Sequence, residues 1–205
     1  SPTGLGMVAT ILSSSSSNSD YITLDNLSVY GNSTHGVYLD TSNDFVEVIG
    51  GHYFDNQYRG LYISGTDLTI TDTLFSNEGS GAYAQDIGLY TSGARATVDN
   101  ITVSGMTSSY GAYVGGSGSL VQNSTFYSNT NDGLSAGGIT VTDVTAYNNG
   151  RDGLAGSGTF YDNTLFNNGN NGIEISSGVA ENNQVFGNAS TGIYARQNGI
   201  VRYNE

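Results

Sequence analysis

The chain has 205 residues, no cysteine, no lysine and a net charge of −13 at pH 7. The length favours a single domain, and the missing cysteine excludes both disulfides and thiolate metal sites. A surface this acidic repels phosphates and anionic lipid headgroups, so we expect no nucleic-acid partner and no membrane insertion.

The first segment, residues 1–20, contains a serine run from Ser13 to Ser17. We expect it to form an N-terminal linker ahead of one folded domain at 21–205. The abundance of Ser, Thr, Asn and Gly without lysine is typical of secreted proteins, so we expect an extracellular or cell-surface location.

From residue 21 onward an aromatic-x-Asn-x-x-x-Gly-aliphatic phrase recurs, with glycines at Gly36, Gly60, Gly81, Gly111, Gly133, Gly153, Gly172 and Gly192. The copy at Gly111 is degraded, and the last four glycines are 20, 19 and 20 residues apart. A period of about 20 residues with strand and turn chemistry predicts a solenoid. Short strands separated by bends, three per turn, describe an all-β, single-stranded parallel β-helix of about eight coils of about 20–24 residues.

Equivalent residues of stacked coils form columns along the axis. Residues one and three positions after the glycine are aliphatic and should point inward. The asparagine four positions before it predicts an inward ladder that satisfies turn backbone groups: Asn32, Asn56, Asn77, Asn129, Asn149, Asn168 and Asn188. We expect the glycine to supply a positive φ at the bend, and the aromatic residue six positions before it to form a stack.

The third coil departs from this spacing, because Gly81 and Gly111 are 30 residues apart. Gly88-Leu89-Tyr90 repeats the Gly-Leu-Tyr of residues 60–62. An alternative register therefore uses Gly88, with a loop from Glu78 to Gln85. Insertions in solenoids often carry function.

The column two residues after the glycine should face solvent, and in the first four coils it holds tyrosine: Tyr38, Tyr62, Tyr83 or, in the alternative register, Tyr90, and Tyr113. We call these residues the tyrosine row, and it is the best binding candidate in the chain. Exposed aromatic faces suit sugar rings or a protein interface. The competing explanation is the high β-propensity of tyrosine.

Two acids, Asp132 and Asp152, precede the glycine in adjacent coils and form the candidate metal site. Neighbouring carboxylates repel unless a cation lies between them. Arg151 can supply this positive charge, so we expect no cofactor. The alternative is a Ca²⁺ ion bound between the two carboxylates. His35 and His52 lack an obvious acidic partner, and no known catalytic motif is present, which favours a non-enzymatic protein.

The phrases at residues 51–56 and 147–154 resemble the right-handed parallel β-helix repeats of the pectate-lyase-like superfamily, as found in mannuronan C-5 epimerases and NosD-type surface or periplasmic proteins. The right hand is implied by this resemblance. Of the epimerase motif Tyr-Gly-x-Asp-Pro-His-Glu, only Tyr110-Gly111 is present, so no catalytic residue is carried over.

These observations favour a secreted or cell-surface structural module, a rigid spacer or a self-assembling fibre or adhesion unit. With no capping helix evident, its partners would be other copies, through the ends, or the rest of a longer parent chain. The alternative is a carbohydrate-binding or carbohydrate-active β-helix, such as part of an epimerase, a lyase or a phage tailspike, with a polysaccharide as partner.

Overall fold

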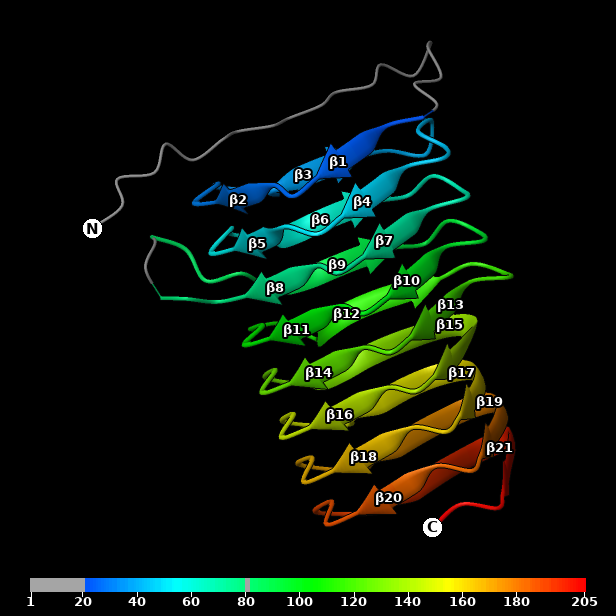
Figure 1. Cartoon of the computed structure of the whole chain (residues 1–205). Helices are drawn as coiled ribbons and strands as arrows, with labels where there is room; N and C mark the ends of the chain where they lie inside the picture. Colours follow the sequence, from blue (N-terminus) through cyan, green and yellow to red (C-terminus); the bar gives the residue numbers. More distant parts are fainter. Residues whose placement is uncertain (1–20, 80–81) are drawn as a thin grey trace.

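The computed structural model describes residues 21–79 and 82–205, and these residues form 21 β-strands joined by bends and turns (Figure 1). The linker expected at residues 1–20 lies outside the described residues. Strands of successive coils stack in parallel, as predicted, into a solenoid of about eight coils. Within the described ranges, no helix is long and apolar enough to cross a bilayer.

Each coil contributes strands to three faces. The first face contains β1 (Thr23–Asp25), β4 (Glu47–Ile49), β7 (Thr69–Thr71), β10 (Thr97–Asp99) and β13 (Leu120–Gln122). The second face contains β2 (Ser28–Tyr30), β5 (His52–Phe54), β8 (Leu74–Ser76), β11 (Thr102–Ser104), β14 (Thr125–Tyr127), β16 (Thr145–Tyr147), β18 (Thr164–Phe166) and β20 (Gln184–Phe186). The third face contains β3 (Val37–Leu39), β6 (Arg59–Ile63), β9 (Ile87–Thr91) and β12 (Tyr110–Gly115).

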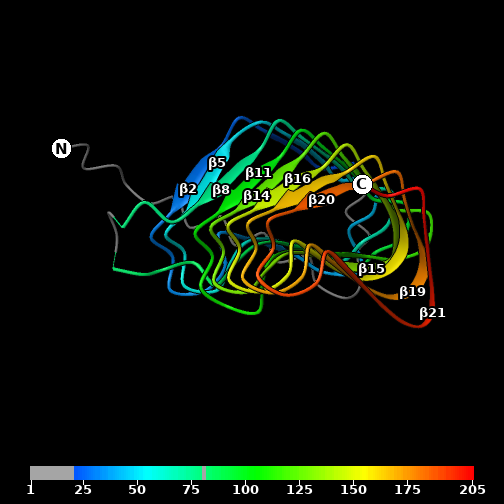
Figure 2. The same ribbon diagram turned by 90° about the horizontal axis from the view of Figure 1, so that it is seen from below.

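In the last coils the third face runs directly into the first face of the next coil. Four long strands make this turn: β15 (Asp132–Thr142), β17 (Leu154–Tyr161), β19 (Ile173–Glu181) and β21 (Ile193–Arg202). Because β15 pairs with both β12 and β13, the first and third faces form one 13-stranded sheet, while the second face is a separate 8-stranded sheet. Figure 2 shows these long strands curving around one corner of the solenoid.

The core consists of columns of apolar side chains from equivalent positions. One column of the first face holds Leu24, Val48, Ile70, Val98, Val121, Val141, Phe160 and Ala180, all buried. The columns expected one and three residues after the repeat glycine are also inward, as with Leu134 and Ala136. Burial of these stacked columns is the main favourable contribution to the fold.

The repeat glycine does not have the predicted backbone conformation. Gly36, Gly60, Gly88, Gly111, Gly133, Gly153, Gly172 and Gly192 all lack a positive φ. Glycine is required at this position because neighbouring coils approach each other closely. A Cβ on Gly133 would lie 2.7 Å from the carbonyl oxygen of Gly153 and 2.8 Å from Nδ2 of Asn149. The position therefore excludes a side chain because the next coil and the ladder amide occupy that space.

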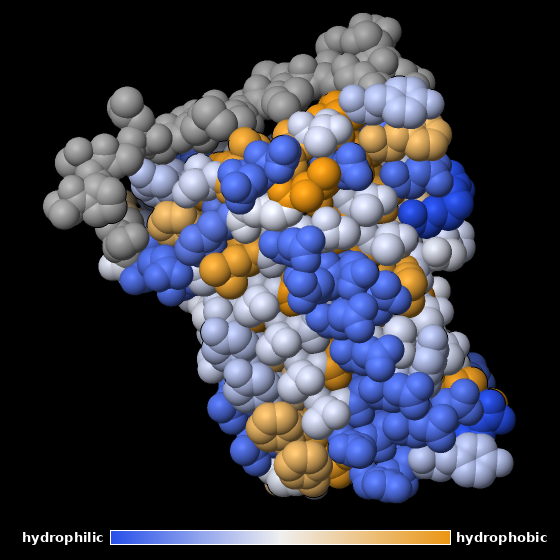
Figure 3. Space-filling model, in the orientation of Figure 1, coloured by the Kyte–Doolittle hydropathy of each residue, from blue (hydrophilic) through white to orange (hydrophobic). Residues whose placement is uncertain are grey.

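Positive φ angles lie instead at other bends, such as the bend directly after the second face, at Ser128, Asn148 and Asn167, and the bend between the first and second faces. We call the Asn and Asp residues of the latter bend the bend row: Asn26, Asp72, Asn100, Asn123, Asp143, Asp162 and Asn182, with φ between 51° and 56°. Asn and Asp tolerate the left-handed conformation better than other non-glycine residues. Figure 3 shows hydrophilic surface running down the junction of these two faces.

The third coil follows the alternative register. Leu61 pairs with Leu89 and Tyr62 with Tyr90, so Gly88 occupies the repeat position and the phrase that ends at Gly81 does not. The described segments on either side of residues 80–81 project from the solenoid between β8 and β9 (Figure 1). Tyr83 belongs to this insertion, and its place in the column is taken by Tyr90.

The asparagine ladder has two segments. Asn129, Asn149 and Asn168 each donate from Nδ2 to Oδ1 of the next member, over 2.9 to 3.0 Å, and the segment ends at Asn188. In the first coils Asn32 donates to Asn56, which donates to Oε1 of Gln85. Gln85 therefore takes the place predicted for Asn77, because the insertion moves Asn77 aside to bond the backbone of Gln85 and Gly105.

A second ladder, Asn163, Asn183 and Asn204, supports the bend between the first and second faces. These positions lie outside the glycine-based phrase, so the spacing of that phrase does not predict them. Their amides bond the backbone of the preceding coil, as Asn163 does with the Val141 carbonyl at 3.1 Å.

Candidate functional site

The tyrosine row lies on the third face, on β3, β6, β9 and β12. Its members are Tyr38, Tyr62, Tyr90 and Tyr113, and successive ring centroids are 4.8, 5.2 and 4.9 Å apart. The rings are nearly parallel, with interplanar angles of 8°, 4° and 22°. The row is therefore a stack that runs along the solenoid axis.

This stacking changes what the row offers a ligand. Each inner ring covers the face of its neighbour, so the faces of the inner rings are not available to a ligand. The row presents ring edges and phenol groups instead, and all four residues are half-buried. A ligand along this row would be held by hydrogen bonds to phenols, with little stacking on ring faces.

A hollow adjoins the first coils of the row. Its lining includes His35, Tyr58, Arg59, Asp86 and Ser108. The Arg59 guanidinium carbon lies 5.0 Å from the Tyr62 ring centroid and 4.7 Å from that of Tyr90. Arg59 forms no ion pair with any described residue, and its buried Nε has no hydrogen-bond partner there.

His35 is the second polar group in this hollow. Its ring centroid lies 5.5 Å from that of Tyr38 and 5.7 Å from that of Tyr62. Burial and the neighbouring charge of Arg59 both lower the pKa of His35, so the imidazole is neutral at pH 7. The hollow therefore combines the Arg59 cation, neutral aromatic groups and the Asp86 carboxylate.

The acids predicted as a metal site meet around Arg151. Its Nε lies 2.8 Å from Oδ1 of Asp132 and 3.1 Å from Oδ2 of Asp152. Glu174 joins this group, because its Oε2 lies 3.9 Å from Nη2 of Arg151. Oε1 of Glu174 lies 2.7 Å from Nη2 of Arg196. Burial raises the pKa of Asp132 to about 6, against the opposing effect of Arg151.

A guanidinium thus occupies the place between the two carboxylates. The described residues contain no group of three or more histidines and acids arranged to hold a metal ion. Asp152 is fully buried and accepts from Arg151, from Nδ2 of Asn170 and from the Asn171 amide, which compensates its burial.

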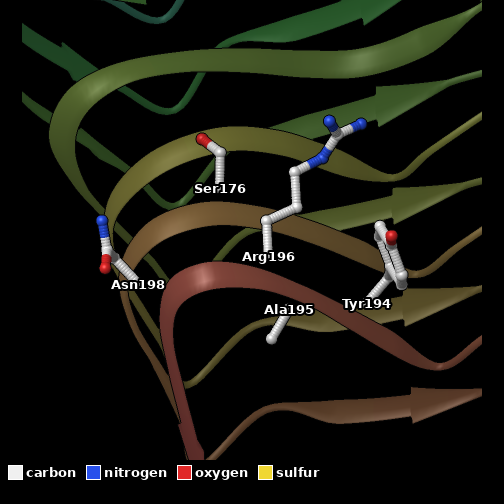
Figure 4. Close-up of a pocket in the computed structure, with 5 residues that line it drawn as sticks. All are labelled: Ser176, Tyr194, Ala195, Arg196 and Asn198. Carbon is white, nitrogen blue, oxygen red and sulfur yellow. The ribbon is translucent and has the colours of Figure 1, made fainter.

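A further hollow lies at the last coil, between β19 and β21. Figure 4 shows Ser176, Tyr194, Ala195, Arg196 and Asn198 around it, with the Arg196 side chain extending above the β21 ribbon. Because Arg196 is held by Glu174, this hollow belongs to the same charged network as Asp132 and Asp152.

His52 has partners that the sequence did not reveal. Its Nε2 lies 2.6 Å from the hydroxyl of Ser76 and 3.5 Å from Oε1 of Glu78. Ser76 and Glu78 are 24 and 26 residues further along the chain, and only the stacking of β5 on β8 brings them together. The expectation that His52 lacks an acidic partner is wrong.

The fold is that of a right-handed parallel β-helix. The chain belongs to the family described as "Right handed beta helix region", which matches residues 10–88 and 85–205. Comparison with curated proteins finds no match. Among solved structures, the A-module of the Azotobacter vinelandii mannuronan C-5 epimerase AlgE4 is similar, with a TM-score of 0.49 and 15% identity over 89% of this chain and 68% of that one.

Proposed function

We propose that this chain is a rigid structural module, secreted or displayed on a cell surface, which joins to a further β-coil through its last coil. Asparagine ladders and aromatic stacks link successive coils in both the first and the last part of the solenoid, which favours a stiff rod. The Ser, Thr, Asn and Gly content without lysine supports an extracellular location.

The exposure of Val201 carries the proposal. Val201 stands in the column of Leu24, Val48 and their equivalents, whose other members are buried, yet 45% of its surface is exposed. Phe186 ends the aromatic column of the second face and is 55% exposed. A further coil placed on β20 and β21 would bury both side chains and pair the free strand edges.

The assembly state of the protein tests this proposal. We expect light scattering and negative-stain electron microscopy to show oligomers or filaments, with and without Ca²⁺. Val201→Asp should disperse them, because it places a charge in the joining surface. Ile200→Asp adds the same charge one residue away on the lateral face and serves as the matched control. A wild-type protein that stays monomeric at every concentration contradicts self-stacking.

A second candidate function is glycan binding on the tyrosine row. The unpaired Arg59 in a hollow beside four phenols favours it, because arginine and phenol groups donate hydrogen bonds to sugar oxygens. Replacing Tyr38, Tyr62, Tyr90 and Tyr113 with phenylalanine keeps the stack and removes only the hydroxyls. Binding on a glycan array that this variant loses supports the function; binding that it retains excludes the row.

A further inference from the structure

The second face carries its own aromatic column, six residues before each repeat glycine in the regular coils. Tyr127, Tyr147, Phe166 and Phe186 stack in the last coils at 5.0 to 5.2 Å, with interplanar angles of 1° to 5°. Tyr30 and Phe54 stack in the first two coils at 4.7 Å. The single continuous stack predicted from the sequence is therefore interrupted.

The interruption spans the third and fourth coils. Ser76 pairs with Phe54, and Ser104 pairs with Tyr127, so serine occupies the column where the other coils have a ring. Phe75, which the repeat phrase placed in this column, instead points into the core beside Tyr53. Two rings are missing between Phe54 and Tyr127.

His52 fills the first of these two places. Its imidazole stacks on Phe54 with centroids 4.2 Å apart. Tyr30 already covers one face of Phe54, and Nε2 of His52 reaches down to Ser76 in the third coil, so the imidazole covers the opposite face. The Ser76 hydroxyl and Glu78 hold it there.

The place above Ser104 in the fourth coil has no ring. The His52 imidazole, at the level of the third coil, and the Tyr127 ring, in the fifth coil, border it, and two coil spacings of about 4.8 Å correspond to about 9.6 Å. One ring placed midway would lie at the spacing that the column shows elsewhere, 4.7 to 5.2 Å. Among the described residues, no ring stacks on this side of either His52 or Tyr127, and Ser104 is partly exposed.

The charged residues near the position above Ser104 determine which charge a bound aromatic ring should carry. Glu78 lies beside His52 with 48% of its side chain exposed, and the buried Asp55 accepts from the amides of Glu78 and Gly79. No arginine contacts His52, Ser76 or Glu78 in the described residues. A positively charged group on the ring is therefore favoured and a carboxylate disfavoured.

We propose that the fourth-coil position above Ser104 is a binding slot for one aromatic ring that carries a positive charge, sandwiched between His52 and Tyr127. Such a small aromatic amine completes the stack of the second face and places its ammonium group toward Glu78. The slot lies on a different face from the tyrosine row and does not depend on the structural role proposed above.

Proton NMR tests this with tyramine as the probe, because the chain has only two histidines. Stacking of the probe shifts the ring protons of His52 upfield in a saturable manner, while those of His35, on the third face, stay in place. 4-Hydroxyphenylacetate has the same ring with the opposite charge, and we expect at least tenfold weaker binding. No saturable His52 shift, or equal shifts of both histidines, overturns the proposal.

Variants locate the slot. Ser104→Tyr places a ring there from the chain itself and should abolish the tyramine response, while Ser104→Ala leaves the slot open and retains it. Tyr127→Ser removes one wall and should also abolish binding, which covers the case in which Ser104→Tyr does not fold. Glu78→Gln should reduce the preference for tyramine over 4-hydroxyphenylacetate. A Ser104→Tyr or Tyr127→Ser protein that folds and binds tyramine as tightly as the wild type overturns the proposal.

Discussion

Gly133 and Gly153 approach each other so closely that a Cβ on Gly133 would lie 2.7 Å from the carbonyl oxygen of Gly153. The same relationship joins Gly153 to Gly172, also at 2.7 Å, so the third-face corner is a column of backbone contacts with no room for side chains. The column ends at Gly192, where a Cβ would meet nothing closer than a Val185 methyl group at 3.5 Å.

This difference predicts that a glycine-to-alanine substitution changes the free energy of unfolding differently at two positions of one column. Gly133→Ala should lower the free energy of unfolding by about 1–3 kcal/mol, the usual effect of overpacking, because neither the backbone nor the ladder amide can move away. In the unassembled chain, Gly192→Ala should be neutral or slightly stabilising, since a Cβ there meets no described atom closer than 3.5 Å. Urea denaturation followed by circular dichroism measures both, and equal losses would contradict the close-approach explanation.

The asparagine ladder gives a second prediction, at Asn149. Its Nδ2 donates to the carbonyl oxygen of Phe126 and to Oδ1 of Asn168, and its Oδ1 accepts from Asn129. Asn149→Asp keeps the shape but points a buried carboxylate at two acceptors, which should cost at least about 2–3 kcal/mol at pH 7.

The charged form of that carboxylate is disfavoured in the fold, so its pKa should rise and the loss should shrink as the pH falls toward 4. Asn148→Asp is the matched control, because Asn148 is exposed and adjacent. Thermal melts at pH 7 and pH 4 check the prediction. A loss at position 149 that does not change with pH would rule out the buried-charge explanation.

A third prediction concerns Tyr53, which is fully buried on the second face. Its hydroxyl has no hydrogen-bond partner among the described residues, and burial raises its pKa to about 12. Phe75, in the next coil of the same column, already shows that phenylalanine fits. Tyr53→Phe should therefore raise the free energy of unfolding by about 1 kcal/mol, the usual cost of an unsatisfied buried polar group.

Chemical denaturation of Tyr53→Phe and of the half-buried Tyr127→Phe, as control, provides the measurement. A destabilised Tyr53→Phe protein would mean that the hydroxyl finds a partner in solution. The control should change little, because the Tyr127 hydroxyl is not enclosed in the core.

The columns of the fold were predictable because they repeat. The period of the glycines was sufficient to place residues such as Leu134 and Leu154 inward and to predict the ladder from Asn129 to Asn188. The third coil was ambiguous, since the aromatic and asparagine spacing indicates Gly81 whereas the Gly-Leu-Tyr sequence indicates Gly88. Only pairing with the coils above and below selects Gly88.

The candidate sites were less predictable, because they depend on side-chain direction and on contacts between coils. The sequence placed Tyr38, Tyr62 and Tyr113 in one column but left open whether Tyr83 or Tyr90 completes it, and only the structure shows Tyr90 stacked between Tyr62 and Tyr113. The meeting of His52 with Ser76 requires both the third-coil register and a rotamer that tilts the imidazole across one coil. Such contacts leave no periodic signal in the chain.

The last prediction concerns pH and Asp132. Burial raises the pKa of Asp132 from 3.8 to about 6, so the folded state holds this proton more tightly than the unfolded state does. Stability therefore increases as the pH falls through 6 toward 4, and the ionised carboxylate is a cost that is fully present above about pH 7. A shift of this size corresponds to about 3 kcal/mol.

Asp132→Asn removes the titration while keeping an oxygen near Arg151. Between pH 8 and pH 4, the wild type should gain up to about 3 kcal/mol relative to this variant. Asp162→Asn, at an exposed position of the bend row, is the charge-matched control and should follow the wild-type profile. Free energies of unfolding measured in urea across this range decide the matter. Parallel profiles for wild type and Asp132→Asn would mean that Arg151 compensates the burial of Asp132 completely.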